Sequence, residues 1–365
     1  MSLPSTAQRR RRVTLLDVAR AAGVSKTVAS RALSGYADVA PATRSRIEEQ
    51  AQTLGYHASA LARALARGRD APARCAVVNL GMTPAQFGRS LYGATLAGIA
   101  AQASLSGVDV HLVTVPAEEM VTPEPLGRLV AEDRADGFIV LTFHPLTPAY
   151  VQPFDAARLP YVLVNRHFDA QAANCVTLDW ADAMERAVQH LTRLGHVRMA
   201  LLLPDSTTSA VRDREQGWRR GLAGCALRGS DAPILRYTEA GQQGGMALAR
   251  DLFQRGLPGS GDRPTGLVCF DDYCAQGVLT AARGAGVAVP EHLSVIGCDG
   301  VIAPYTCPPL CSFDARPHDL GVAAAQLLVA TLHVTAPPRR QLLPLALQCR
   351  ASCGPAPGAP GHGVY

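Results

Sequence analysis

The chain has 365 residues, of which 48% are hydrophobic and 18% are charged, a composition typical of a globular protein with room for several domains. It contains no run of 18 apolar residues, and its basic first segment lacks an apolar signal core, so neither a membrane span nor secretion is predicted. Residues 1–70 contain 12 basic and 5 acidic side chains, whereas residues 71–365 contain 23 and 25. Such a concentrated positive charge favours contact with nucleic-acid phosphates.

Residues 13–33 predict two short helices joined by a tight turn. Thr14 can cap the first helix, and an acid follows three positions later, as in a capping box. Gly23 allows a sharp turn, and Ser25 is a good N-cap for a second helix over Lys26–Leu33. The second helix begins with polar side chains, and its apolar residues are spaced to face a core. This is the helix-turn-helix pattern, in which the second helix enters a groove of DNA.

We place the predicted DNA-binding domain at residues 13–57. One further helix is predicted within this domain, and another directly after it. One helix covers Ala42–Leu54 and has Ile47 on its apolar face. Residues 58–70 predict a short helix rich in alanine and leucine, too short to be helical alone in water. We expect it to fold only against DNA or a second copy of itself. Residues 1–12, with four consecutive arginines, are predicted to be a disordered arm that contacts phosphates.

From residue 74 onward, short apolar runs alternate with helical stretches. The runs lie at residues 74–80, 108–115, 137–141, 161–164, 199–203, 266–270 and 294–297. Buried parallel strands have this composition, and the alternation predicts an α/β fold of two doubly wound lobes over residues 71–353. We place the first lobe at about 74–173 and 316–335, and the second at about 174–315 and 336–353. Residues 354–365 are rich in glycine and proline and are predicted to be a disordered tail.

The segment Val13–Leu65 resembles the DNA-binding head of the lactose-repressor (LacI) family in its motifs VTLLDVARAAGVS, SRALSG, TRSRI, LGY and ALARAL. It departs from the family at Val28-Ala29, where Thr-Val is usual, and at Ala58-Ser59, where a proline is usual. The resemblance implies that DNA is contacted by Thr14, Ser25, Lys26, Thr27, Ser30, Arg31, Leu61 and Leu65. Leu65 matches the leucine that inserts into the minor groove at the centre of the site.

The resemblance continues to the C-terminal part of the chain and implies a periplasmic-binding-protein-like core, with an effector in the crevice between the lobes. The expected effector-binding residues are Tyr92, Phe143, Arg166, Trp180, Arg214, Asp271 and Asp299. Carboxylates accept hydrogen bonds from hydroxyls, arginines donate in a fixed fork, and aromatic rings offer flat faces, so the set suits a sugar-like ligand. Two arginines also suit a carboxylate or phosphate, and the choice between a neutral sugar, a sugar acid and a nucleoside stays open.

The main prediction is a ligand-gated, DNA-binding transcriptional regulator in the cytoplasm, most simply a repressor that its effector releases from DNA. A homodimer is expected, because one recognition helix reads only half of a site. The alternatives are a sugar-binding protein for transport and an α/β enzyme that uses Asp271 and Asp272, although the sequence contains no GxSxG, Walker or HExxH motif. No cofactor, metal or membrane partner is expected, and the 10 cysteines are predicted to be buried or neutral thiols.

Overall fold

The computed structural model describes residues 15–33, 39–54, 73–89, 91–119, 122–132, 134–227, 232–239, 241–257, 262–332 and 337–358. The chain divides into two compact units, Met1–Ala73 and Arg74–Tyr365. The predicted arm, the predicted hinge segment 58–70 and three expected DNA contacts, Thr14, Leu61 and Leu65, lie outside the described residues. None of the described helices combines the length and the apolar character that a membrane span requires.

Within its described residues, 15–33, 39–54 and 73, the smaller unit has three helices, α1 (Leu15–Ala21), α2 (Lys26–Leu33) and α3 (Pro41–Thr53). Gly23 has a φ of 65° in the turn between α1 and α2, where a residue with a side chain would be strained. The Ser25 hydroxyl accepts a hydrogen bond from the Val28 amide at 3.2 Å, which is the predicted N-cap. The helices enclose a small core of Val18, Ala19, Ala22, Ala29, Ala32, Val39, Ile47 and Ala51. Val28 and Leu33, which we expected inside, lie half-buried at its edge.

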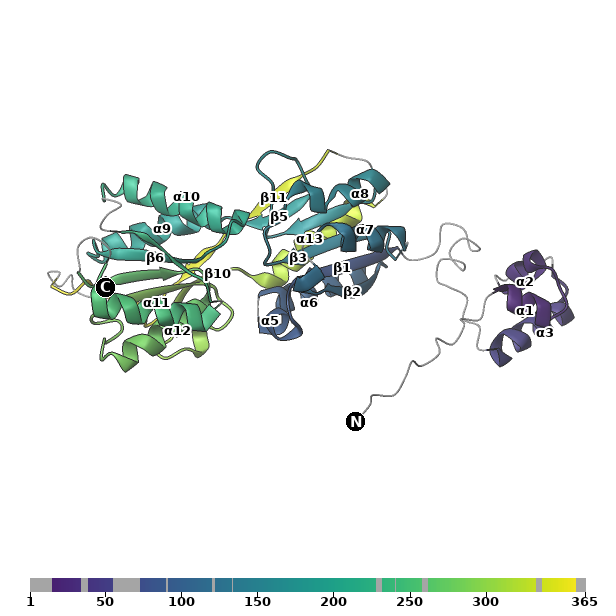
Figure 1. Ribbon diagram of the computed structural model, residues 1–365, viewed down its shortest axis with the longest axis horizontal. Coiled ribbons are helices and arrows are strands. Elements are labelled where there is room, and N and C mark those ends of the chain that lie inside the picture. The colour runs from purple at the N-terminus through teal and green to yellow at the C-terminus, as the bar shows by residue number, and fades with distance from the viewer. Residues whose placement is uncertain are drawn as a thin grey trace. The chain divides into compact units, whose positions relative to one another are not determined.

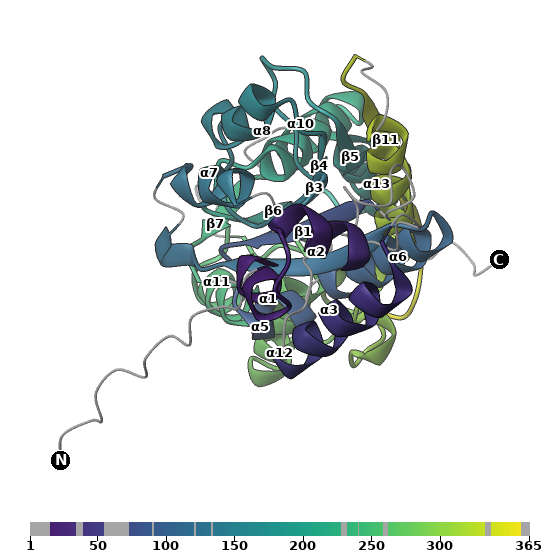
Figure 2. The ribbon, with the colours of Figure 1, turned by 90° about the vertical axis from the view of Figure 1, so that its right-hand side faces the viewer.

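The first lobe of the larger unit is built on six parallel strands in the order β11-β5-β4-β3-β1-β2. Helices α7 and α8 cover one face of this sheet, and α6 and α13 cover the other (Figure 2). The bounds are β1 (Arg74–Leu80), β2 (Asp109–Val115), β3 (Gly137–Thr142), β4 (Tyr161–Val164), β5 (Cys175–Leu178) and β11 (Arg340–Leu343) for the strands, and α5 (Pro84–Arg89), α6 (Leu91–Leu105), α7 (Glu124–Ala131), α8 (Gln152–Ala157) and α13 (Pro317–Thr331) for the helices.

The second lobe has the strand order β12-β10-β9-β8-β6-β7, in which β12 runs antiparallel to β10 and the other pairs are parallel. Helices α9 and α10 lie on one face, and α11 and α12 lie on the other (Figure 1). The bounds are β6 (Met199–Pro204), β7 (Ile234–Tyr237), β8 (Gly266–Cys269), β9 (Ser294–Asp299), β10 (Cys311–Asp314), β12 (Ala346–Gln348), α9 (Trp180–Arg193), α10 (Ser209–Gly224), α11 (Gly241–Arg255) and α12 (Asp272–Gly284). Short 3₁₀ turns cover Ala117–Glu119, Pro148–Tyr150 and Ala303–Tyr305.

The boundary between the lobes differs from our expectation. β5 pairs with β4, and β11 pairs with β5, so both strands belong to the first sheet, although we had assigned residues 174–178 and 336–343 to the second lobe. Each of these strands has only four residues, and their partners are distant in the chain. Strand pairing of this kind depends on non-local hydrogen bonds, which a local sequence pattern does not reveal.

Glycines let the helices of the second lobe pack closely in pairs. A Cβ atom at Gly217 of α10 would lie 2.0 Å from the Ala181 carbonyl oxygen of α9, and one at Gly245 of α11 would lie 2.2 Å from the Cys274 carbonyl oxygen of α12. Only a residue without a side chain permits this approach. The contact at Gly217 holds the helix that contains Arg214 against α9.

Candidate functional site

A cavity of about 390 Å³ lies between the two lobes. It is at the carboxyl ends of the parallel strands, because Phe143 follows β3, Arg166 follows β4, Asp271 follows β8 and Asp299 ends β9. Open α/β sheets bind ligands at this edge. The lining residues are Gln86, Leu91, Phe143, Asn165 and Arg166 from the first lobe, and Arg214, Gly241, Gln242, Gln243, Phe270, Asp271, Tyr273 and Asp299 from the second.

Two arginines in this lining are almost completely buried. Arg214 is 3% exposed, and its guanidinium carbon lies 3.4 Å from the ring centroid of Trp180 and 4.3 Å from that of Phe270. Its terminal nitrogens donate to the carbonyl oxygens of Ala210 at 2.9 Å and Phe270 at 3.2 Å. Burial lowers the pKa of Arg214. The stacked rings therefore hold this guanidinium in one orientation.

Arg166 approaches the cavity from the first lobe and is 5% exposed. One of its terminal nitrogens donates to the Asn165 carbonyl oxygen at 2.6 Å. Within the part of the chain that the structure describes, neither Arg166 nor Arg214 forms an ion pair, and the Nε atom of each is buried without a hydrogen-bond partner. A guanidinium has five N–H donors, of which Arg214 uses two and Arg166 uses one in these hydrogen bonds, and both side chains line the cavity, so donors remain for a ligand.

Carboxyl groups occupy the second-lobe side of the cavity. Asp271 caps α12, because its side chain accepts a hydrogen bond from the Cys274 amide at 2.7 Å. Asp299 has a φ of 98° and accepts from the Val301 amide at 3.0 Å. A positive φ at a residue other than glycine is strained, and such strain is concentrated at functional sites.

The neighbouring Asp272 lies behind this lining. Asp272 accepts hydrogen bonds from the Ser312 hydroxyl at 2.6 Å and from the backbone amides of Ile302 and Ala303, in the loop after β9. Burial, and then the charges of Asp272 and Asp271, raise the pKa of Asp299 well above its ordinary value. Burial, followed by repulsion from Asp272, raises the pKa of Asp271 to about 6. Both shifts favour the protonated form of these lining acids more than in an exposed carboxyl group, and a protonated carboxyl group can donate as well as accept a hydrogen bond.

Tyr92 and Trp180 do not line the cavity, which corrects our expectation that their ring faces meet a ligand. The Tyr92 hydroxyl donates to the carbonyl oxygens of Thr142 at 3.1 Å and Val164 at 3.5 Å, and its buried ring lies 5.4 Å from the Phe143 ring. Trp180 is 1% exposed, donates from Nε1 to Asn165 Oδ1 at 2.9 Å, and stacks on Arg214. Both residues support the lining from behind, because neighbouring side chains already cover their rings.

Sequence reasoning missed the glutamines. Gln86 comes from α5, and Gln242 and Gln243 form the first turn of α11. None of them follows a strand, and the family resemblance did not point to them. The sequence signal that could have indicated Gln242 and Gln243 is their position as a polar pair directly after Gly241. This glycine begins the helix with a φ of 64°.

Two of the ten cysteines, Cys307 and Cys349, are exposed, and the other eight are buried or half-buried. A hydrogen bond from Cys353, assisted by the Arg350 backbone, lowers the pKa of Cys311 to about 5 despite burial. The two free thiols come from two separate CxxxC sequences, Cys307–Cys311 and Cys349–Cys353, so spacing alone does not indicate this contact.

The small unit presents its predicted DNA-binding residues at the start of α2. Ser25, Lys26, Thr27 and Arg31 are exposed, and Ser30 is half-buried. The buried residues of α2, Ala29 and Ala32, lie on its other side, against α1 and α3. The polar face of α2 is thus accessible on the surface of this unit.

The comparisons with known proteins cover both units. The model of lacI-family bacterial regulatory proteins matches residues 14–59, and that of the periplasmic binding protein-like domain matches residues 188–353. The transcriptional regulator GalS of Salmonella typhimurium is 30% identical over 332 residues, covering 89% of this chain and 92% of GalS. A solved complex of the transcriptional regulator CelR with cellobiose is 26% identical, with a TM-score of 0.67, and covers 93% of this chain and 100% of that one.

The fold is also that of the lac repressor, solved as a dimer bound to operator and the anti-inducer ONPF. That chain is 24% identical and has a TM-score of 0.71, and the match covers 94% of this chain and 100% of that one. These relatives are transcriptional regulators rather than enzymes, and the resemblance inferred from the sequence motifs is confirmed. The chain belongs to the lacI family of bacterial regulatory proteins.

Proposed function

We propose that this regulator is a cytoplasmic repressor that binds operator DNA as a homodimer through α2 and leaves it when a sugar-like effector occupies the cavity between the lobes. The observation that carries the proposal is the lining of that cavity. It combines two buried arginines, Arg166 and Arg214, with two acids, Asp271 and Asp299, and it also contains aromatic side chains.

This lining suits a polyhydroxylated ring. Each ring hydroxyl both donates and accepts, so it can bond to an arginine and to an acid at the same time. Phe143, Phe270 and Tyr273 supply apolar surface for the carbon–hydrogen face of a sugar. The bound cellobiose of the solved CelR complex supports a sugar as the ligand class.

The DNA-binding part of the proposal rests on the exposed start of α2. Lys26 and Thr27 are the first two residues of this helix, where a recognition helix contacts base edges. Two such helices are needed to read a two-fold symmetric operator, and the lac repressor dimer on its operator supports that arrangement. The effector acts by changing the lobe arrangement and hence the affinity for DNA, and the coupling is reciprocal.

The effector is tested by thermal unfolding of the full chain in a library of common monosaccharides and disaccharides, with uronates and nucleosides as separate arms. A ligand that binds only the folded state raises the melting temperature. We expect a sugar to do so, and Arg214→Ala to lose the shift. Arg219→Ala is the matched control, because Arg219 is on the same helix and its side chain is 72% exposed. A shift from nucleosides alone would contradict a sugar ligand.

Operator recognition is tested by selecting binding sites from random duplex DNA. The wild type should select a pseudo-palindrome. Lys26→Ala should relax the preference within each half-site, at a cost of about 1–3 kcal/mol per lost base contact. Arg46→Ala, which removes an exposed positive charge from α3, is the control and should weaken binding evenly across sequences. An unchanged preferred sequence for Lys26→Ala would show that α2 does not read the bases there.

A further inference from the structure

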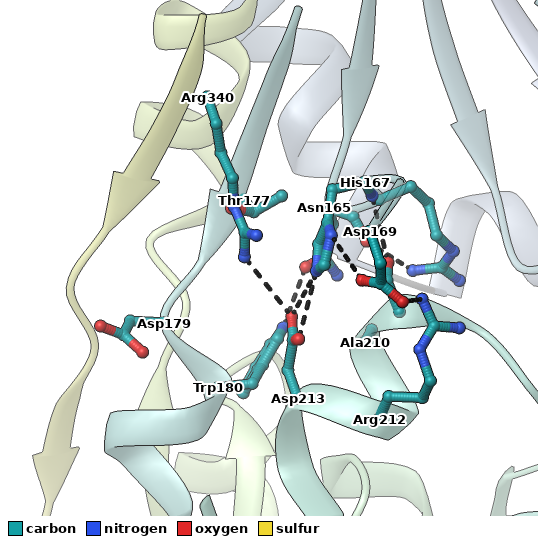
Figure 3. A network of polar contacts seen from close by, with 12 residues as sticks. Asn165, His167, Asp169, Thr177, Asp179, Trp180, Ala210, Arg212, Asp213 and Arg340 are labelled. Atoms are coloured by element: carbon teal, nitrogen blue, oxygen red, sulfur yellow. Dashed lines mark hydrogen bonds and ion pairs between the residues drawn. The ribbon is translucent and has the colours of Figure 1, made fainter. Parts of the chain in front are cut away.

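A second polar site lies where the two lobes meet, next to the effector cavity (Figure 3). The His167 Nε2 atom of the first lobe lies 3.1 Å from both carboxylate oxygens of Asp213 on α10 of the second lobe. Since a carboxylate only accepts, Nε2 is the donor. The His167 amide also donates to the Ser209 hydroxyl of α10 at 3.1 Å. His167 is 9% exposed, so these bonds are largely shielded from water.

Charged neighbours extend this contact on both sides. Arg212 of α10 pairs with Asp169 of the first lobe at 2.8 Å, and the same carboxylate faces His167 Nδ1 at 3.5 Å. Arg340 of β11 approaches Asp213 at 3.8 Å. All of these interactions except the His167–Asp169 contact join the first lobe to α10 of the second. His167, Asp169, Asp213 and Arg340 line a cavity of about 430 Å³ that is separate from the effector cavity.

The two segments that form this junction also hold the two buried arginines. His167 follows Arg166 in the chain, and Asp213 precedes Arg214. Arg166 and Arg214 line the effector cavity, whereas His167 and Asp213 line the second cavity. A change in the distance between His167 and Asp213 must therefore change the separation of the two guanidinium groups that face the effector.

We propose that His167 and Asp213 are positioning residues, whose hydrogen bond across the lobe junction sets the spacing of Arg166 and Arg214 in the effector cavity. The inference rests on the proposed role of that cavity. The pair holds the lobes closed in the absence of ligand, and the Arg212–Asp169 pair assists it. A hydrogen bond to a charged group shifts a two-state equilibrium by about tenfold, so loss of the pair should raise the open population by about that factor.

Trp180 provides a readout that needs no ligand. It is one of two tryptophans in the chain, it is 1% exposed, and its ring stacks on Arg214. In a Trp218→Phe background it is the sole tryptophan. Its Nε1 atom donates to Asn165 Oδ1 of the first lobe at 2.9 Å, so separation of the lobes would break this hydrogen bond and admit water to the indole ring. We therefore expect its emission to shift to longer wavelength and its quenching by acrylamide to increase.

The experiment compares full-length single-tryptophan proteins with Asp213→Ala, His167→Ala, both changes, Asp213→Asn, or Gln216→Ala. Both single alanine variants should increase quenching, and the double variant should not exceed them, because one bond is lost in each case. Asp213→Asn keeps an oxygen acceptor and should restore the parental quenching. Gln216→Ala is the matched control, because it enlarges the same second cavity from the same helix and should leave quenching unchanged.

Parental quenching in Asp213→Ala and His167→Ala, with cooperative thermal unfolding retained, would overturn the proposal. Equal quenching in Asp213→Ala and Asp213→Asn would overturn the role of the hydrogen bond. If the alanine variants do not fold, Asp169→Ala takes their place, because its carboxylate is 65% exposed and it removes the Arg212 pair. A smaller increase is expected from it, and none would count against the proposal. Because no ligand is used, this failure is distinct from failure of the sugar test.

Discussion

Replacing Asp271 by asparagine should stabilise the folded protein at neutral pH, although the residue lines the effector cavity. Burial, and then the neighbouring Asp272, raise the pKa of Asp271 from 3.8 to about 6. A carboxyl group with a raised pKa binds its proton more tightly in the folded state. Its contribution therefore favours folding below the unfolded pKa and is lost as the pH rises through 6. Asparagine has no charge to lose.

The size of the effect follows from the shift in pKa. A shift of about two pKa units, at 1.36 kcal/mol each, means that Asp271→Asn raises the free energy of unfolding by about 3 kcal/mol at pH 8 and by about half of that at pH 5. Because Asp271, Asp272 and Asp299 titrate together, we expect a gain in the free energy of unfolding of about 2–3 kcal/mol at pH 8. The asparagine oxygen can still accept from the Cys274 amide, and the helix cap is kept. For the unit Arg74–Tyr365, with an unfolding entropy of about 2.1 cal/mol/K per residue, this gain raises the melting temperature by about 3–5 °C.

The assay is thermal unfolding of the wild type and Asp271→Asn at pH 5 and pH 8. The difference in melting temperature should be about twice as large at pH 8 as at pH 5. Asp179→Asn is the control. The Asp179 side chain caps α9 by accepting from the Asp182 amide at 3.0 Å, and it lies outside the carboxyl cluster. This variant therefore shows the effect of replacing aspartate by asparagine at a helix cap without that cluster. An Asp271→Asn protein that melts at or below the wild-type temperature at pH 8, or whose gain is the same at both pH values, would refute the reasoning.

Two further substitutions test the packing that positions the sites. Gly217→Ala should destabilise the larger unit by about 1–3 kcal/mol, because the new Cβ atom would lie 2.0 Å from a backbone oxygen of α9. Gly224→Ala is the control on the same helix, because its Cβ atom would meet nothing within 4 Å, and it should leave the stability unchanged. Equal melting temperatures for the two would contradict this. Ile47→Ala should lower the free energy of unfolding of the small unit by about 2–5 kcal/mol, because Ile47 is fully buried, and should abolish DNA binding. Calorimetry should show that the larger unit melts as in the wild type. Retained DNA affinity would show that this core tolerates the cavity.

Much of the fold could be predicted because its signals are local. The turn at Gly23, the Ser25 cap and the apolar spacing of α2 lie within a dozen residues, and the structure has each of them. The apolar strands β1, β3 and β4 were also predicted within a residue of their bounds, because a strand buried on both faces has an unbroken apolar sequence. Arg166 and Asp271 were expected at the effector site from the family resemblance, and both follow strands of this kind.

Only the tertiary structure decided which side chains share the cavity and which lie behind it. Tyr92 and Trp180 have the chemistry of stacking residues, but their rings are covered by Phe143 and Arg214, which come from other elements. The assignment of β5 and β11 to the first sheet and the contact between His167 and Asp213 likewise depend on residues far apart in the chain. The local elements follow from the sequence alone, since helix caps, turns and apolar periodicity act over a few residues. The burial of Arg166 and Arg214, and the raised pKa of Asp271 that burial causes, follow from how the lobes pack together, and no local pattern contains that information.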